Sequence, residues 1–215
     1  MIRSVLLGTL LSLCSTSVTI AHTSTYVAAA PAGYSQPMPE AVYWQLIESS
    51  LQNTETLEEQ EDYLSEALEE MSAEQLVGFK LRTDQLLMDS YSSPLWCAAY
   101  LMKGGCGEED FAFFRCWLIS RGQKIYKLGI QHADDIAFAV QANTNSAFDF
   151  EALQTLPASI YKKKTEQDIA AAIDYTQVHT QPQDYPTLQI NWREQAPGTM
   201  QVICPKLYQL FWEQQ

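Results

Sequence analysis

The sequence predicts a mainly α fold: a compact orthogonal helical domain of about seven helices with a loop-rich C-terminal tail. Three observations lead to this prediction. Apolar residues recur at helical spacing from Glu40 onward. Serine, proline and glycine stand where these helices would begin or end. Strand-like alternation is sparse, and its best case, Thr187 to Trp192, is not enough to predict a sheet.

Composition limits the class of protein. The chain has 215 residues, of which 47% are hydrophobic and 11% aromatic, enough to bury a core without metal or disulfide support. Its formal charge is -13, from 26 acidic and 13 basic residues. Such a field repels phosphate, so nucleic acid and anionic lipid are not expected as partners. Acidity by itself indicates solubility rather than a function.

Residues 1–21 have the pattern of a secretory signal peptide. A short basic start ending at Arg3 is followed by an apolar run over 4–13. Thr19 and Ala21 then supply the small residues of a cleavage site. The alternative is an uncleaved first helix of a cytoplasmic protein, but this stretch has no repeating polar face. We therefore expect a periplasmic or secreted protein.

A lipoprotein anchored at Cys14 is a second alternative, although Leu13 is larger than the residue usual before a lipidated cysteine. Residues 22–39 are rich in Ala, Pro, Ser and Thr and predict a flexible tether. The helical domain is expected over residues 40–215. After the signal, no stretch has the roughly 18 consecutive apolar residues of a membrane span.

The first four helices follow from apolar stripes and end signals. The first starts at Glu40, with the stripe Tyr43, Leu46, Ile47 and Leu51. The second carries the stripe Leu57, Leu64, Leu68 and Met71. Ser72 and Gln75 form a capping-box pattern that begins the third. Ser93-Pro94 begins the fourth, and Gly104-Gly105 ends it.

The remaining helices are predicted with weaker signals. One runs from Glu108 to Gly122, one from Gln123 to Gln131, and a short one lies over Asp134–Ala142. Thr165 to Tyr175 is expected to be helical, with Thr165 as its cap. Prolines then divide the tail into loops and short pieces, at positions Pro182, Pro186, Pro197 and Pro205.

One region carries a family resemblance. It contains Leu95-Trp96-Cys97-Ala98-Ala99-Tyr100, then Gly104-Gly105-Cys106-Gly107-Glu108-Glu109-Asp110-Phe111, then Phe114-Arg115-Cys116-Trp117-Leu118-Ile119. This pattern resembles a bacterial family known as domain of unknown function 4240, and weaker similarity extends from Tyr43-Trp44 to Leu207. The resemblance implies a compact helical domain without an established activity.

Two departures from the family pattern bear on function. The family has Ser-Asp-Asp where this chain has Gly107-Glu108-Glu109. Glutamate is one methylene longer than aspartate, so a family role that depends on the short aspartate side chain does not carry over. Cys97 and Cys116 fill positions that the family leaves variable, which suggests added disulfide chemistry. Removal of the expected signal leaves four of the five cysteines, at positions 97, 106, 116 and 204, which allow three full pairings. The helices that carry Cys97 and Cys116 are joined by a short turn, so we expect these two to pair.

Aromatic residues are expected to gather around the Gly104-Gly105 turn, namely Trp96, Tyr100, Phe111, Phe114 and Trp117. Two helices that meet at a tight turn need large side chains between them, so core packing is the first interpretation. The alternative is a groove that binds a peptide or glycan by stacking. In either case the corner is the expected centre of the fold.

Arg115 lies on an otherwise apolar stretch of helix and needs a carboxylate or carbonyl partner. A structural ion pair with an acid from another helix is favoured over a ligand clamp. Glu108, Glu109 and Asp110 fall in the first turn of that helix, where acids complement the helix dipole. The functional alternative is a cation site or general acid/base pair with Arg115 or His132.

Catalytic and metal motifs are missing from the sequence. His22, His132 and His179 do not stand at ligand spacing, so no metal site and no cofactor are predicted. We expect a non-catalytic binding or structural module of the bacterial envelope, whose partner is an unknown protein or small ligand. The alternative is a hydrolase that uses Cys106, with a pKa lowered at a helix N-terminus, or the acids at 108–110 with Arg115. The oligomeric state stays open.

Overall fold

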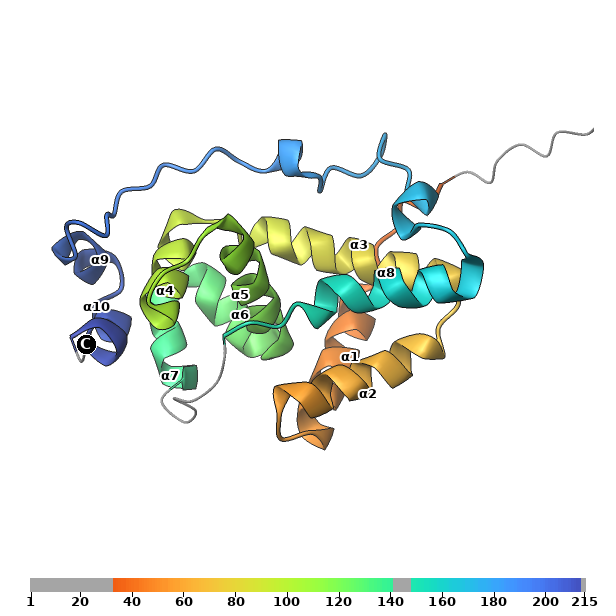
Figure 1. Cartoon of the computed structure of the whole chain (residues 1–215), viewed down its shortest axis with the longest axis horizontal. Helices are drawn as coiled ribbons and strands as arrows, with labels where there is room; N and C mark the ends of the chain where they lie inside the picture. Colours follow the sequence, from red (N-terminus) through yellow and green to blue (C-terminus); the bar gives the residue numbers. More distant parts are fainter. Residues whose placement is uncertain (1–32, 141–147, 214–215) are drawn as a thin grey trace, which may run out of the picture. The chain divides into compact units, whose positions relative to one another are not determined.

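A computed structural model describes residues 33–140 and 148–213 of the chain (Figure 1). These residues form helices connected by loops, and the two isolated β-bridges among them, Tyr34 with Ile173 and Arg193 with Ala196, build no strand. The mainly α prediction is confirmed. The expected signal peptide, Cys14 and residues 22–32 of the expected tether lie outside the described residues.

The first part of the domain contains nine helical elements. They are α1 Glu40–Asn53, α2 Leu57–Glu69, α3 Ala73–Asp89, α4 Ser93–Lys103, α5 Glu108–Ser120, α6 Gln123–Gln131, the 3-10 helix η1 Ala133–Ile136, α7 Ala137–Val140 and α8 Ala152–Thr165. The C-terminal part contains short elements only. They are η2 Ile169–Ala172, η3 Pro182–Asp184, α9 Gly198–Ile203, α10 Pro205–Leu207 and the π-helical turn η4 Tyr208–Trp212.

The capping chemistry explains where these helices start. At α3 the predicted capping box is confirmed. The backbone amide of Gln75 donates to the Ser72 hydroxyl at 3.2 Å, and the Ser72 amide donates to the side-chain oxygen of Gln75 at 2.9 Å. At α4 the cap is Ser92 instead of Ser93, because Ser93 is already helical and the Ser92 hydroxyl accepts from the Leu95 amide at 3.4 Å. Gly104 ends α4 at φ 69°, as predicted.

The prediction of a helix over Thr165 to Tyr175 is wrong. Thr165 is the last residue of α8, and Asp168 caps only a 3-10 turn by accepting from the Ala170 amide at 2.8 Å. The sequence hides α8 because Pro157 lies inside it, and proline removes a helical hydrogen bond. Packing offsets that loss, since α8 lies against α3 (Figure 1) and buries Leu153 and Ile160.

The end of the expected tether is attached to the domain. The Met38 amide donates to the Gly78 carbonyl at 2.7 Å, and Met38 is buried. Tyr34 pairs with the chain after η2: its amide donates to the Ala172 carbonyl at 2.7 Å. These hydrogen bonds join residues 34 and 38 of the expected tether to the helical domain.

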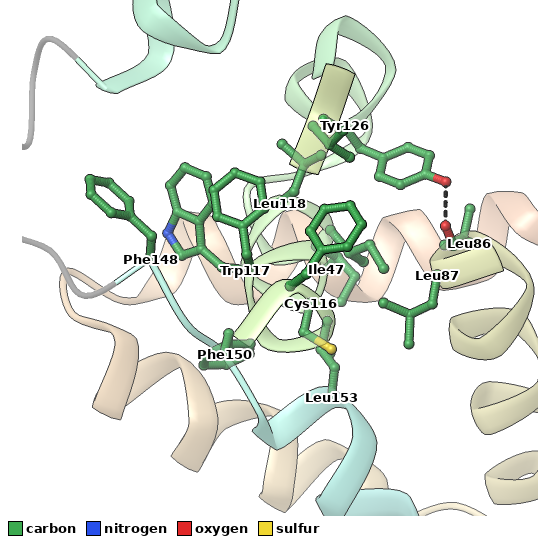
Figure 2. Packing of buried hydrophobic residues seen from close by; sticks show 14 of the residues in the cluster. Ile47, Leu86, Leu87, Cys116, Trp117, Leu118, Tyr126, Phe148, Phe150 and Leu153 are labelled. Carbon is green, nitrogen blue, oxygen red and sulfur yellow. Dashed lines mark hydrogen bonds between the residues drawn. The ribbon is translucent and has the colours of Figure 1, made fainter. Parts of the chain in front are cut away.

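The helix α5 lies at the centre of the core, because it contacts α1, α3, α4, α6 and α8. Its residues from Phe114 to Ser120 are all buried. Figure 2 shows Trp117 and Leu118 of α5 packed among side chains of α1, α6 and the segment before α8. A polar side chain in this second half of α5 is therefore buried among other helices. Among the described helices, none is both long and apolar enough to cross a membrane.

Candidate functional site

The acids predicted at the start of α5 divide into two kinds. Asp110 is structural, because its carboxylate accepts from the Gly107 amide at 3.1 Å and lies 3.5 Å from the Lys103 ammonium. It therefore satisfies a free amide at the helix N-terminus, where a negative charge is favourable. Glu108 and Glu109 are exposed. The structure thus takes Asp110 out of the candidate site and leaves two glutamates.

Arg115 is two turns further along α5 and is only 3% exposed. Its Nε donates to the Phe111 carbonyl at 3.2 Å, and its Nη1 donates to the Leu87 carbonyl. Leu87 belongs to the last turn of α3, where carbonyls attract positive charge, and its carbonyl also accepts from the Ser90 hydroxyl at 3.1 Å. The neighbouring Leu86 carbonyl accepts from the Tyr126 hydroxyl at 2.7 Å (Figure 2). Arg115 therefore caps α3 from a different helix.

Aromatic rings surround the guanidinium of Arg115. Its central carbon lies 4.7 Å from the ring centre of Phe111, 5.0 Å from that of Tyr91 and 5.5 Å from that of Tyr185. Rings at these distances attract a cation through their negative faces. Trp96 completes the cluster by stacking on Phe111, with 4.9 Å between ring centres. Arg115 therefore lies in an aromatic cage.

The ion pair expected for Arg115 is not formed in the described part of the chain. Every ion pair there uses a lysine, namely Lys80, Lys103, Lys163 or Lys206. Carbonyl dipoles and aromatic faces surround Arg115 instead. The charge of this buried arginine is thus stabilised without being neutralised by a carboxylate.

A cavity of about 610 Å³ opens beside Arg115. One wall is a face of α5, because positions 108, 112 and 115 are four and three residues apart on the helix. The other wall is the C-terminal segment around η3, and Tyr91 lies between them. The lining residues are Tyr91, Glu108, Glu109, Ala112, Arg115, Pro182, Tyr185, Pro186 and Thr187. Burial, with the Glu108 carboxylate nearby, raises the pKa of Tyr91.

The sequence predicted only part of this cavity. Glu108, Glu109 and Arg115 were expected at a site, while Tyr91 and Tyr185 were not. Tyr185 stands between two prolines, Pro182 and Pro186, which read only as loop signals. A tyrosine in a proline-rich tail has no periodic pattern that points to a partner, so its edge-on contact with Tyr91, 4.8 Å between ring centres, appears only in the fold.

Two aromatic candidates belong to other clusters. Tyr100 packs beside Trp192 and Trp212, with 5.3 and 6.2 Å between ring centres, and burial together with the Glu194 carboxylate raises the pKa of Tyr100 to about 12. Trp117 packs edge-on against Phe148 at 5.2 Å (Figure 2). Of the predicted binding aromatics, only Trp96 is thus part of the cage around Arg115.

The expected pairing of Cys97 with Cys116 is not what the structure shows. Both are free thiols, and Figure 2 shows Cys116 pointing toward Leu153 of α8. Cys97 faces α9 instead, with its sulfur 4.0 Å from the Met200 carbonyl oxygen. Burial raises the pKa of Cys116 to about 12, so that thiol is unreactive at neutral pH.

The environment of Cys106 contradicts the expectation of a lowered pKa. Burial raises the pKa of Cys106 to about 12, and its thiol donates to the adjacent Gly107 carbonyl at 3.6 Å. Cys106 is not among the residues that line the cavity beside Arg115. In the described part of the chain, no group of three or more His, Cys, Asp or Glu residues is placed to hold a metal ion.

Fold and cavity together define a helical domain with a buried arginine that lines an open cavity. Residues 38–163, more than half of the chain, match the family described as "Protein of unknown function (DUF4240)", and the chain belongs to that family. Comparisons with curated proteins and with solved structures found no match. The family match includes the α5 wall with Arg115 and ends before the wall that contains Tyr185.

Proposed function

We propose that the protein is a non-catalytic binding module that holds a small zwitterionic ligand, with the chemistry of an amino acid or a peptide end, in the cavity beside Arg115. The observation that carries this proposal is the environment of Arg115. It is nine-tenths or more buried, no carboxylate among the described residues pairs with it, and it lines an open cavity.

The donor capacity of Arg115 supports a carboxylate ligand. A guanidinium has five N–H donors, and the described partners of Arg115 are two backbone carbonyls. The remaining donors can bind a carboxylate, whose two oxygens match the geometry of the guanidinium fork. A ligand carboxylate would also neutralise the charge of a buried side chain, and such an interaction is stronger than one in bulk water.

The rest of the cavity favours a ligand that also carries a positive group. Glu108 and Glu109 lie on the same cavity as Arg115, and the whole chain has a charge of -13. This field opposes a purely anionic ligand and attracts an ammonium group. Tyr185 and two prolines supply apolar surface for the body of the ligand. A zwitterionic ligand with an apolar body matches the guanidinium of Arg115, the two glutamates and the apolar surface together.

The thiol chemistry supports binding over hydrolysis. A cysteine nucleophile must ionise near neutral pH, and the pKa of Cys106 is raised to about 12. We further propose that this module is exported to a bacterial envelope. That part of the proposal is supported by the signal-peptide pattern of residues 1–21 and by the resemblance to a bacterial family.

The test is a substitution that fills the cavity without removing a hydrogen bond. Ala112→Leu places a larger side chain on the cavity face of α5, and Ala67→Leu makes the same change on α2, away from it. A panel of free amino acids and short peptides would be titrated by calorimetry, each peptide with a free and an amidated C-terminus. We expect the full chain to bind free carboxylates only, with affinity reduced at least tenfold by Ala112→Leu and retained by Ala67→Leu.

Two results would contradict the proposal. One is equal binding of amidated and free peptides, which would show that Arg115 does not receive a carboxylate. The other is unchanged binding by Ala112→Leu, which would place the ligand elsewhere. Mass spectrometry of the recovered ligand separates binding from catalysis, because a hydrolase would return a cleaved product.

A further inference from the structure

Two cysteines far apart in the chain lie against each other. Cys97 is on α4 and Cys204 is at the junction of α9 and α10, and both are completely buried. The Cys97 sulfur lies 4.0 Å from the Met200 carbonyl oxygen, four residues before Cys204. The Cys204 sulfur lies 3.8 Å from the Pro94 carbonyl oxygen, three residues before Cys97. Each sulfur thus approaches the helix that carries the other.

The two thiols are also near enough to influence each other, because the Cys97 thiol, together with burial, raises the pKa of Cys204. The other two described cysteines have different surroundings: Cys106 donates to its neighbour Gly107, and Cys116 faces α8. The fold therefore selects one pair out of the possible pairings of four cysteines.

The segment that carries Cys204 is already held in place by non-covalent contacts. The amides of Lys206 and Leu207 donate to one carboxylate oxygen of Asp134, at 2.9 and 3.0 Å. Met200 and Leu207 are completely buried. These contacts hold Cys204 against α4, with its sulfur 3.8 Å from the Pro94 carbonyl oxygen, while both cysteines are free thiols.

We infer that Cys97 and Cys204 form a disulfide under oxidising conditions and that this bond fastens the C-terminal segment to α4. The reaction is thiol–disulfide exchange with a small disulfide oxidant such as oxidised glutathione. One cysteine thiolate attacks the oxidant, and the other displaces the second thiol from the mixed disulfide. One S–S bond forms and one breaks, and the two protons and two electrons lost by the cysteines leave with two thiols of the reduced oxidant.

Burial sets the rate of this step. The nearby Cys97 thiol, together with burial, raises the pKa of Cys204, so the docked Cys204 thiol is a poor nucleophile. Oxidation therefore proceeds when the C-terminal segment undocks or during folding, and the bond then holds the segment in its docked position. This inference does not depend on the ligand proposed for the Arg115 cavity.

The experiment uses the full chain, reduced and then incubated with oxidised glutathione. Free thiols are alkylated, and the protein is digested without reduction for mass spectrometry. We expect one linked pair of peptides, containing Cys97 and Cys204, with Cys116 alkylated. Closing a loop of about 100 residues should raise the midpoint of thermal unfolding by roughly 10 °C over the reduced form.

The variants separate the bond from a general effect of oxidation. Cys97→Ser and Cys204→Ser should lose the linked peptides and the shift between oxidised and reduced forms. Cys116→Ser, which replaces another buried cysteine, should keep both the linked peptides and the shift in the unfolding midpoint. Alkylation of both Cys97 and Cys204 after oxidation, a stable glutathione adduct on either, or a Cys97–Cys116 link would overturn the inference. The peptide map of the unsubstituted chain decides the question even if a variant does not fold.

Discussion

At Arg115, a permanent positive charge is held inside the domain by groups that carry no full negative charge. Its partners are the Leu87 and Phe111 carbonyls and three aromatic rings. The sequence indicated that this arginine needs an acceptor, because its neighbours are apolar. It could not indicate a carbonyl of α3, because helix ends are satisfied by whichever side chains the fold brings to them.

Replacing Arg115 by Met should therefore destabilise the domain. Arg115→Met keeps most of the side-chain length but removes the guanidinium donors to the Leu87 and Phe111 carbonyls and the cation from the cage, leaving the Leu87 carbonyl with the Ser90 hydroxyl. We expect the free energy of unfolding to fall by about 3 kcal/mol, measured by urea denaturation. Arg193→Met, at an exposed position, should change it by less than about 0.5 kcal/mol. Equal effects would show that the Arg115 contacts are not stabilising.

The α4–α5 corner shows how local signals determine an element. Gly104 at φ 69° ends α4, and α5 starts three residues after Gly105, at Glu108. These residues were predicted because glycine adopts the left-handed conformation that other residues avoid. The expectation that all the nearby aromatics share one cluster failed in part, since Tyr100 and Trp117 face other elements.

The docking of α10 provides a prediction for a single element. Asp134 of η1 accepts from two amides of α10, which are free donors at a helix N-terminus. Asp134→Ala should lower the protection of residues 204–212 against hydrogen exchange by about tenfold, because two hydrogen bonds are lost. Asp134→Asn, which keeps an acceptor oxygen, should retain most of this protection. Loss of the same protection in the exposed control Asp62→Ala would contradict this assignment.

Over the whole molecule, the C-terminal segment contributes residues to the cavity and to the packing of the helices. Tyr185 forms part of the cavity wall beside Arg115, the indole of Trp192 donates to the Ser93 carbonyl at 3.1 Å, and Cys204 lies against Cys97. The family match ends at residue 163, before all three. Both the cavity and the thiol pair therefore combine the family domain with a part of the chain beyond the match.

The proposed export concerns the whole chain and can be measured directly. If residues 1–21 are a signal peptide, the protein recovered from the periplasm of an expressing bacterium should begin at His22. A control with Leu7→Arg and Leu10→Arg, which interrupt the apolar run, should stay in the cytoplasm with its N-terminus uncleaved. Recovery of the unsubstituted chain only in the cytoplasm, starting at Met1, would contradict export.

The sequence by itself determined the helical class, the starts of α1, α3, α5 and α6, and the end of α4. These features depend on side-chain periodicity, caps and glycine, which act over one or two helical turns. The tertiary structure alone decided that Tyr185 lies on Arg115, that Cys204 lies against Cys97, and that α8 accommodates Pro157. The first two contacts join residues 70 or more positions apart, and the third depends on packing against α3, so no local pattern could specify them.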